Sequence, residues 1–220
     1  MYGFRCYADN GQILVSSEYL GYHIINGLTY VGTTRVPNTT WGLIWQKYSI
    51  NLPTSLVPMI FLDFDVNDTG VVAGLNKVGN NWEFLVRGTV ATNINKIKVF
   101  AKYVGATPTG NGLVIKKDNG DVAFSSVNSP LWLTDYAVSG TVTLQSPNFD
   151  QITGTLSQTL VNPIYWATIV AGASFAISQT VALVGWKRTG TNTWATQNLG
   201  TGGATVTVRN ISMLIADLVT

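Results

Sequence analysis

Apolar and polar residues alternate along several short segments of the chain. Residues 62–67, 96–103 and 205–209 each place apolar side chains at every second position, with Asp, Lys or Thr between most of them. This period is typical of half-buried β-strands. No segment has a convincing helical spacing of apolar residues, and Gly, Thr and Asn are too frequent for a helix to persist. The pattern predicts an all-β fold of short antiparallel strands.

The beginning of the chain recurs, in diverged form, in its second half. Residues 3–17 (GFRCYADNGQILVSS) match residues 112–126 (GLVIKKDNGDVAFSS), and both contain Asp-Asn-Gly. This tripeptide predicts a β-hairpin with a type I′ turn, which needs positive φ at both central positions. Later landmarks repeat in the same order: 57–61 with 162–166, 74–82 with 185–194, 88–89 with 200–201, and 101–104 with 216–219. We therefore expect two tandem antiparallel β-sandwich domains related by internal duplication.

A segment rich in Gly, Pro and Thr separates the two matched halves. It covers residues 104–111 and contains no strand-like alternation. Such composition marks loops and linkers. We place the first β-sandwich domain at residues 1–106 and the second at 107–220.

One apolar segment, residues 163–186, has no charged residue before Lys187 and is long enough to span a bilayer. Polar residues and Gly172 interrupt it, however, and it divides naturally into runs at 165–170, 174–178 and 181–186. Buried strands read as continuous apolar runs. We expect three short strands here rather than a membrane helix.

Charged residues make up only 11% of the chain, less than half of the usual share of about 25%. Sparse charge suggests that much of the surface faces other subunits, although a neutral surface of Thr, Asn, Ser and Gln is the alternative. The net charge of +2 is too small to indicate a nucleic-acid partner. The first residues show no secretory leader, so none is expected.

The chain offers little material for catalysis or metal binding. It has one histidine, His23, and one cysteine, Cys6, which cannot supply a catalytic triad or a closed zinc site. Asp63, Asp65 and Asp68 form the only acidic cluster, and a solvated strand face that ends in an Asx turn is the simpler interpretation of it than a cation site. We expect no catalytic residue, no metal and no cofactor.

Aromatic residues are the remaining candidates for a binding surface. Trp41, Trp45 and Tyr48 lie in one aromatic-rich segment, and Trp82 and Trp194 end the matched segments of the two halves. Exposed rings of this kind stack on sugars or anchor protein interfaces. Trp41 and Trp45 share strand parity with Leu43, so core packing is an equally good explanation for some residues of the aromatic-rich segment. We take all five as candidate interface or glycan-stacking residues.

The opening residues resemble those of a known group of proteins. Tyr2-Gly3-Phe4-Arg5, the Asp9–Gly11 turn and the strand ending at Ser17 resemble the start of small virion proteins encoded among the tail genes of siphophages. The resemblance implies a non-enzymatic structural component of the tail tip or tail fibre, made in the host cytoplasm and assembled into the virion.

In that role the chain would be present in several copies, dock on tail-tip, central-fibre or baseplate subunits and could assist host attachment. Lys96, Lys98 and Lys102 share one strand face and could meet anionic lipopolysaccharide or DNA, but such lysines more often form a solvated face or guard a sheet edge. The alternative function is a tandem carbohydrate-binding module for host-surface glycans. A polysaccharide depolymerase is a weaker third reading, because no catalytic base is in evidence.

Overall fold

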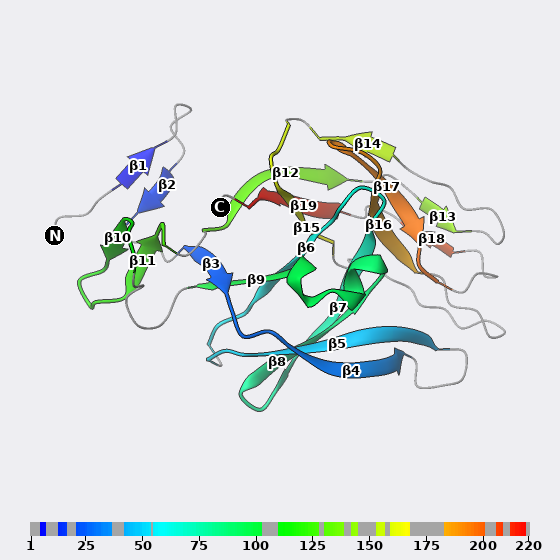
Figure 1. The fold of residues 1–220 in the computed structure, drawn as a ribbon, viewed down its shortest axis with the longest axis horizontal. Helices are drawn as coiled ribbons and strands as arrows, with labels where there is room; N and C mark the ends of the chain where they lie inside the picture. The colour runs from blue at the N-terminus through cyan, green and yellow to red at the C-terminus, as the bar shows by residue number, and fades with distance from the viewer. Residues whose placement is uncertain are drawn as a thin grey trace.

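The fold is described from a computed structural model. It describes residues 5–7, 13–16, 21–36, 42–53, 55–102, 110–127, 130–138, 142–144, 153–156, 159–167, 183–200, 206–208 and 212–218. Within these residues the regular structure consists of β-strands and two short 3₁₀ turns (Figure 1).

The strands of the first half are β1 (Arg5–Tyr7), β2 (Ile13–Ser16), β3 (Tyr22–Ile25), β4 (Thr29–Val36), β5 (Leu43–Asn51), β6 (Met59–Asp63), β7 (Thr69–Val78), β8 (Asn81–Arg87) and β9 (Ile97–Lys102). The 3₁₀ turns η1 (Thr89–Thr92) and η2 (Ile94–Lys96) lie between β8 and β9. The strands of the second half are β10 (Val114–Lys116), β11 (Val122–Ser125), β12 (Trp132–Val138), β13 (Val142–Leu144), β14 (Thr153–Thr155), β15 (Pro163–Trp166), β16 (Val184–Arg188), β17 (Thr193–Asn198), β18 (Val206–Val208) and β19 (Ser212–Asp217).

Two large sheets carry most of these strands. The six-stranded sheet has the order β12-β19-β15-β6-β9-β3, and the seven-stranded sheet has the order β14-β17-β16-β7-β8-β5-β4. The pairs β1–β2, β10–β11 and β13–β18 form small two-stranded sheets, and every pairing found is antiparallel. The prediction of an all-β, antiparallel fold is confirmed.

Each large sheet is continuous across the two halves of the chain. The first half supplies one block of neighbouring strands and the second half supplies the other. The blocks join where β6 pairs with β15, at Leu62 and Tyr165, and where β7 pairs with β16, at Gly70 and Trp186. The two halves are therefore linked by backbone hydrogen bonds in both sheets.

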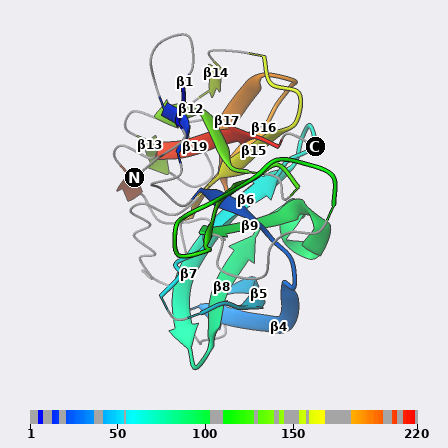
Figure 2. The ribbon, with the colours of Figure 1, turned by 90° about the vertical axis from the view of Figure 1, so that its left-hand side faces the viewer.

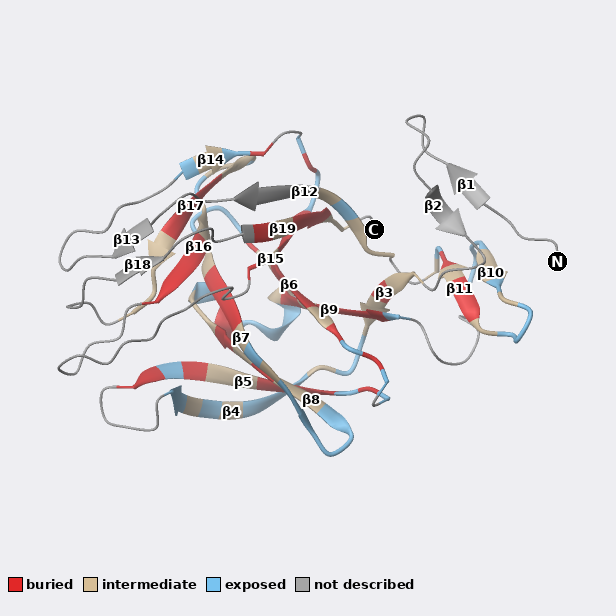
Figure 3. Ribbon diagram, turned by 180° about the vertical axis from the view of Figure 1, so that it is seen from behind, coloured by how far each residue is buried: buried red, intermediate tan, exposed pale blue. Residues whose placement is uncertain are grey.

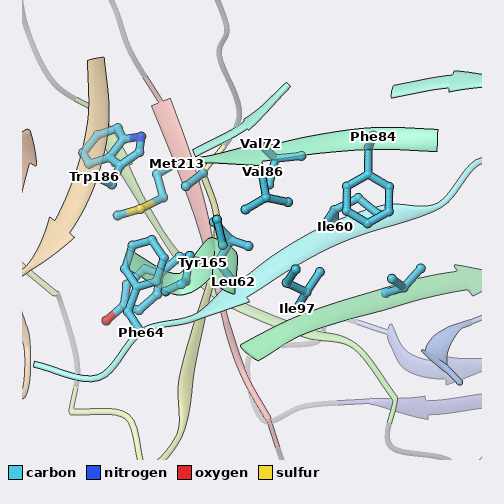
Figure 4. Close-up of a cluster of buried hydrophobic side chains, with 14 of the residues drawn as sticks. Ile60, Leu62, Phe64, Val72, Phe84, Val86, Ile97, Tyr165, Trp186 and Met213 are labelled. Carbon is cyan, nitrogen blue, oxygen red and sulfur yellow. The ribbon is translucent and has the colours of Figure 1, made fainter. Parts of the chain in front are cut away.

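One central core fills the space between the two sheets. Side chains from the six-stranded sheet, such as Leu62, Tyr165 and Met213, meet Val72 and Trp186 from the seven-stranded sheet (Figure 4). All five are at most 3% exposed. Because both halves contribute, neither half buries its inner face alone.

The strands of the six-stranded sheet are buried on both faces near its middle. Ile60 and Leu62 of β6 point into the central core, whereas Phe61 packs on the opposite face with Phe100 and Ile164. The rings of Phe61 and Phe100 meet edge to face, with centroids 5.5 Å apart. The alternation predicted at 96–103 is present in β9 as far as Lys102, but its second face is also apolar at the centre of the sheet. The strand predicted at 62–67 is shorter than expected, because β6 ends at Asp63 and Val66 lies exposed in the turn that follows.

The hairpins β1–β2 and β10–β11 have the same pairing pattern and lie next to each other (Figure 1). The partners in the first are Arg5 with Ser16, Cys6 with Val15 and Tyr7 with Ile13; those in the second are Val114 with Ser125, Ile115 with Phe124 and Lys116 with Val122. Each register shifts once, after the second pair. Adding 109 to the residue numbers of each pair in the first hairpin gives the corresponding pair in the second. The matched sequences 3–17 and 112–126 are separated by the same 109 positions.

The turn of the second hairpin differs from the predicted type I′ geometry. Gly120 has a φ of 88°, but Asn119 does not have a positive φ. The N–H of Gly120 donates to the carbonyl of Lys117, so residues 117–120 form the turn. Gly120, the last residue of this turn, has its backbone in the left-handed region. A turn of this kind accommodates the extra residue of the bulged register. The corresponding turn at Asp9–Gly11 lies outside the described residues.

The apolar segment 163–186 begins in β15 and ends in β16. These strands overlap two of the three that were predicted, and the one expected at 174–178 lies outside the described residues. In the part of the chain that the structure covers, no helix has the length and apolar character needed to cross a membrane.

Candidate functional site

Three of the five aromatic candidates are buried core residues. Trp45 is 4% exposed, Tyr48 2% and Trp194 6%. The Tyr48 hydroxyl donates a hydrogen bond to the carbonyl of Ala91 (2.6 Å), and the ring of Trp194 meets that of Trp186 edge to face. Trp82 is half buried against the same core, and Trp41 lies outside the described residues. Buried rings cannot stack on a glycan without rearrangement.

His23 connects the first half of the chain to the second. Its side chain is fully buried in β3. The Nδ1–H group donates to the carbonyl of Gly21 (3.1 Å), and Nε2 accepts from the backbone N–H of Ser125 in β11 (3.1 Å). Burial lowers the pKa of His23 below its ordinary value of 6.5. The ring therefore links β3 to β11 through two backbone groups.

This link predicts a pH-dependent stability. Below about pH 6.5 the unfolded chain binds a proton at His23 that the folded chain, with its lowered pKa, does not bind. The free energy of unfolding should therefore fall as the pH drops from about 7.5 to 5.5. Urea denaturation at the two pH values measures this change. In a His23→Gln variant the dependence should flatten, and an unchanged pH dependence would refute the assignment.

The acidic cluster is neutralised by lysines. Lys96 Nζ donates to a carboxylate oxygen of Asp65 (2.5 Å) and also to Asp68, and Lys98 lies 3.9 Å from a carboxylate oxygen of Asp63. Burial raises the pKa of Asp63. Burial also acts to raise that of Asp68, but hydrogen bonds from Lys96 and Thr89 outweigh it and the pKa is lowered.

The cluster therefore has an internal structural role. Asp68 closes a turn, because its backbone N–H donates to the carbonyl of Asp65 and its carboxylate accepts from the N–H of Asp65 (both 2.9 Å). Lys96 occupies the position between the carboxylates that a cation would need. Within the described ranges, no group of three metal-ligating side chains is found.

The open edge of β4 is a surface feature that the aromatic pattern did not indicate. Among the strands that the structure describes, β4 is the last of the seven-stranded sheet and pairs only with β5 (Figure 2). It is eight residues long, and the other edge strands of the two large sheets are β12 with seven residues, β3 with four and β14 with three. Six of its residues are exposed, including Tyr30, Val31 and Val36 (Figure 3). Its only charged residue is Arg35.

An open pocket of about 430 Å³ lies where the two halves meet on the seven-stranded sheet. Arg87, at the end of β8, stands in it, and the remaining lining residues are Ile44, Gln46, Val86, Gly88, Ala91, Asn198, Leu199 and Gly200. Arg87 Nε donates to the carbonyl of Leu199 (2.6 Å), and Nη1 donates to that of Ile44. Burial lowers the pKa of Arg87. Sequence inspection missed this pocket because its two sides are about 110 residues apart in the chain.

No protein-family model, curated protein or solved structure matches the chain. The function has therefore to be inferred from the edge of β4, the pocket at Arg87 and the sequence itself.

Proposed function

We propose that the chain is a non-enzymatic structural protein of a bacteriophage tail, at the tail tip or tail fibre, and that it docks on neighbouring subunits through the edge of β4. The observation that carries this proposal is the long, exposed and nearly uncharged edge strand. An open edge presents unpaired N–H and C=O groups to any strand that approaches it. The resemblance of residues 2–17 to siphophage tail proteins supports the location in the virion.

The composition of β4 favours docking over protection. Edge strands that must avoid other chains usually carry lysine, proline or an inward-pointing charge. β4 has no lysine or proline in Thr29–Val36. It carries one charge, Arg35, and one bulge, at Val31, and the stretch from Gly32 to Val36 is regular. The exposed apolar residues Tyr30, Val31 and Val36 would lose contact with water when another strand is added.

We take a second copy of this chain as the first occupant of the edge. Arg35 is the only charge on β4, so antiparallel pairing of two β4 strands sets like charges opposite each other only in the register centred on Arg35. All other registers place Arg35 opposite a neutral residue. A symmetric pair of this kind joins two seven-stranded sheets into one and is consistent with several copies per virion. Other tail subunits would then bind the remaining surfaces.

We also propose that the two halves are diverged copies of one β-sandwich unit, with a boundary near residue 106. The shared register and bulge of β1–β2 and β10–β11 support this. The strand orders support it as well, because β12-β19-β15 mirrors β3-β9-β6 about the junction in one sheet and β17-β16 mirrors β8-β7 in the other. The two units share sheets and a core, so they would act as one body in the tail.

A pair of charge-matched variants tests the docking proposal. Val31→Lys/Val36→Lys places two lysines on β4, at positions 50% and 40% exposed, where the fold tolerates them. Size-exclusion chromatography with light scattering should give a dimer or larger assembly for the wild type and a monomer for this variant. Circular dichroism checks that the variant is folded.

Val57→Lys/Val78→Lys is the control, because it adds the same charge at positions 55% and 51% exposed away from β4. It should keep the mass of the wild type. A wild-type chain that is monomeric at every concentration would contradict self-docking, and so would a β4 variant that retains the wild-type mass.

A further inference from the structure

We infer that the pocket at Arg87 binds an acidic sugar, a hydroxylated ring that carries one carboxylate. The inference goes beyond docking through β4 and does not depend on it. It rests on the combination of one half-buried guanidinium, two primary amides and an aliphatic surface in a pocket of about 430 Å³. That volume lies within the range of about 300–1,000 Å³ typical of small-molecule sites.

Arg87 supplies the positive charge of the pocket. Two of its nitrogens bind backbone carbonyls, of Leu199 and Ile44, and these bonds fix the guanidinium plane at the junction of the halves. Among the described residues no carboxylate lies within ion-pair distance of Arg87, and no hydrogen bond is made by Nη2. A fixed, partly desolvated guanidinium with N–H groups to spare is suited to a carboxylate, which it can bind through two parallel hydrogen bonds.

Two amides provide donors and acceptors for hydroxyl groups. The side chain of Gln46 makes no hydrogen bond within the described part of the chain. Asn198 Oδ1 accepts from the N–H of Gly200 (2.8 Å), which orients its side chain and leaves Nδ2 for a ligand. Amide groups of this kind can both donate to and accept from a sugar hydroxyl.

The rest of the lining is aliphatic or lacks a side chain. Ile44 and Leu199 present aliphatic side chains, and Gly88 and Gly200 leave backbone accessible. Such a surface suits the C–H face of a sugar ring. A phosphate group would lack the additional cations or clustered N–H donors that bind its extra charge, and a neutral sugar would leave the guanidinium without a counter-charge. A uronic acid unit offers a carboxylate to Arg87, hydroxyl groups to the two amides and a C–H face to the aliphatic surface.

Isothermal titration calorimetry on the full chain, with glucuronate, glucose and inorganic phosphate as separate probes, tests the inference. Glucuronate should bind, and glucose should bind at least about tenfold more weakly because it lacks the carboxylate. Phosphate should not displace glucuronate. The inference is overturned if glucuronate does not bind, if glucose binds equally well, or if phosphate alone binds.

Two variants assign the binding to this pocket. Arg87→Lys keeps the charge but not the two-pronged geometry, and should weaken glucuronate binding about tenfold or more. Because Arg87 also holds two backbone carbonyls, Gln46→Glu provides a second test that leaves those bonds in place; its carboxylate should repel glucuronate and abolish binding.

Lys77→Gln is the control, since it removes an exposed cation on β7 that does not line the pocket, and should leave the affinity unchanged. Wild-type affinity in Gln46→Glu would place the ligand elsewhere and refute the assignment. Because the readout is ligand affinity rather than molecular mass, failure here is distinguishable from failure of β4 docking.

Discussion

Replacement of Trp186 by alanine is expected to lower the free energy of unfolding by about 3–5 kcal/mol, a large part of the stability of an ordinary domain. Trp186 is 1% exposed in the central core and meets Trp194 edge to face, with centroids 5.0 Å apart. It lies on β16 at the point where this strand pairs with Gly70 of β7. The cavity would therefore open where the two halves of the chain meet.

The loss of stability should affect both halves equally, because they share one core. Hydrogen exchange measured on β8 and on β17 should accelerate together in Trp186→Ala, and fluorescence and circular dichroism should report one coincident transition. Val161→Ala is the control, since Val161 is 84% exposed, and should change stability by less than about 0.5 kcal/mol. Retained protection of β8 with loss of protection in β17 would show that the halves fold independently.

Gly88→Ala is the second substitution for which we expect a large effect. Gly88 has a φ of 112°, in the region that favours glycine, and an added Cβ would lie 2.3 Å from the carbonyl oxygen of Thr69. Thr69 belongs to the backbone of β7, which cannot move without disturbing its pairing with β16. The backbone conformation should cost about 1–2 kcal/mol and the steric overlap about 1–3 kcal/mol more.

Gly27→Ala separates these two contributions. Gly27 has a comparable φ of 96°, but an added Cβ would meet nothing within 4 Å. Urea denaturation of the two variants should show the smaller loss, of about 1–2 kcal/mol, for Gly27→Ala and a clearly larger one for Gly88→Ala. Equal losses of stability in the two variants would mean that the close approach of Gly88 to Thr69 in β7 does not add to the cost of the substitution.

Local patterns in the sequence predicted local structure well. Alternating residues at 96–103 become β9, and the matched Asp-Asn-Gly segment at 118–120 becomes a hairpin turn. The turn type was wrong because the bulge that selects it depends on cross-strand pairing, which the tripeptide does not specify. Strand period and turn residues act over a few positions, so they are legible in one sequence.

The arrangement of strands between the halves could not be predicted in this way. The sequence match aligns Ala101 with Ala216, and Met59 with Ile164. In the sheet, however, Met59 pairs with Phe100 and Ile164 pairs with Ala216. Phe100, and not Ala101, therefore corresponds to Ala216, and both pack on the same outer face. A one-residue slip exchanges the faces of a strand, so a sequence match between two short strands can easily choose the wrong face.

The candidate site was the least predictable part. Trp45 and Tyr48 read as plausible binding residues, yet both are buried, because aromatic composition alone does not show which face of a strand is covered. The pocket at Arg87 combines β5, β8 and residues 198–200, which come together only in the folded chain. The open edge of β4 likewise depends on the order of strands in the sheet.

Hydrogen–deuterium exchange of the peptide 29–36 as a function of protein concentration tests the central claim, that β4 is a docking edge, most directly. The amides of β4 that point away from β5 have no strand partner among the described residues, so in dilute solution they should exchange fast. As the chain associates they should become protected, while peptide 76–82, in the β7–β8 hairpin, keeps its exchange rate. Assemblies that form without any added protection in 29–36 would contradict the claim.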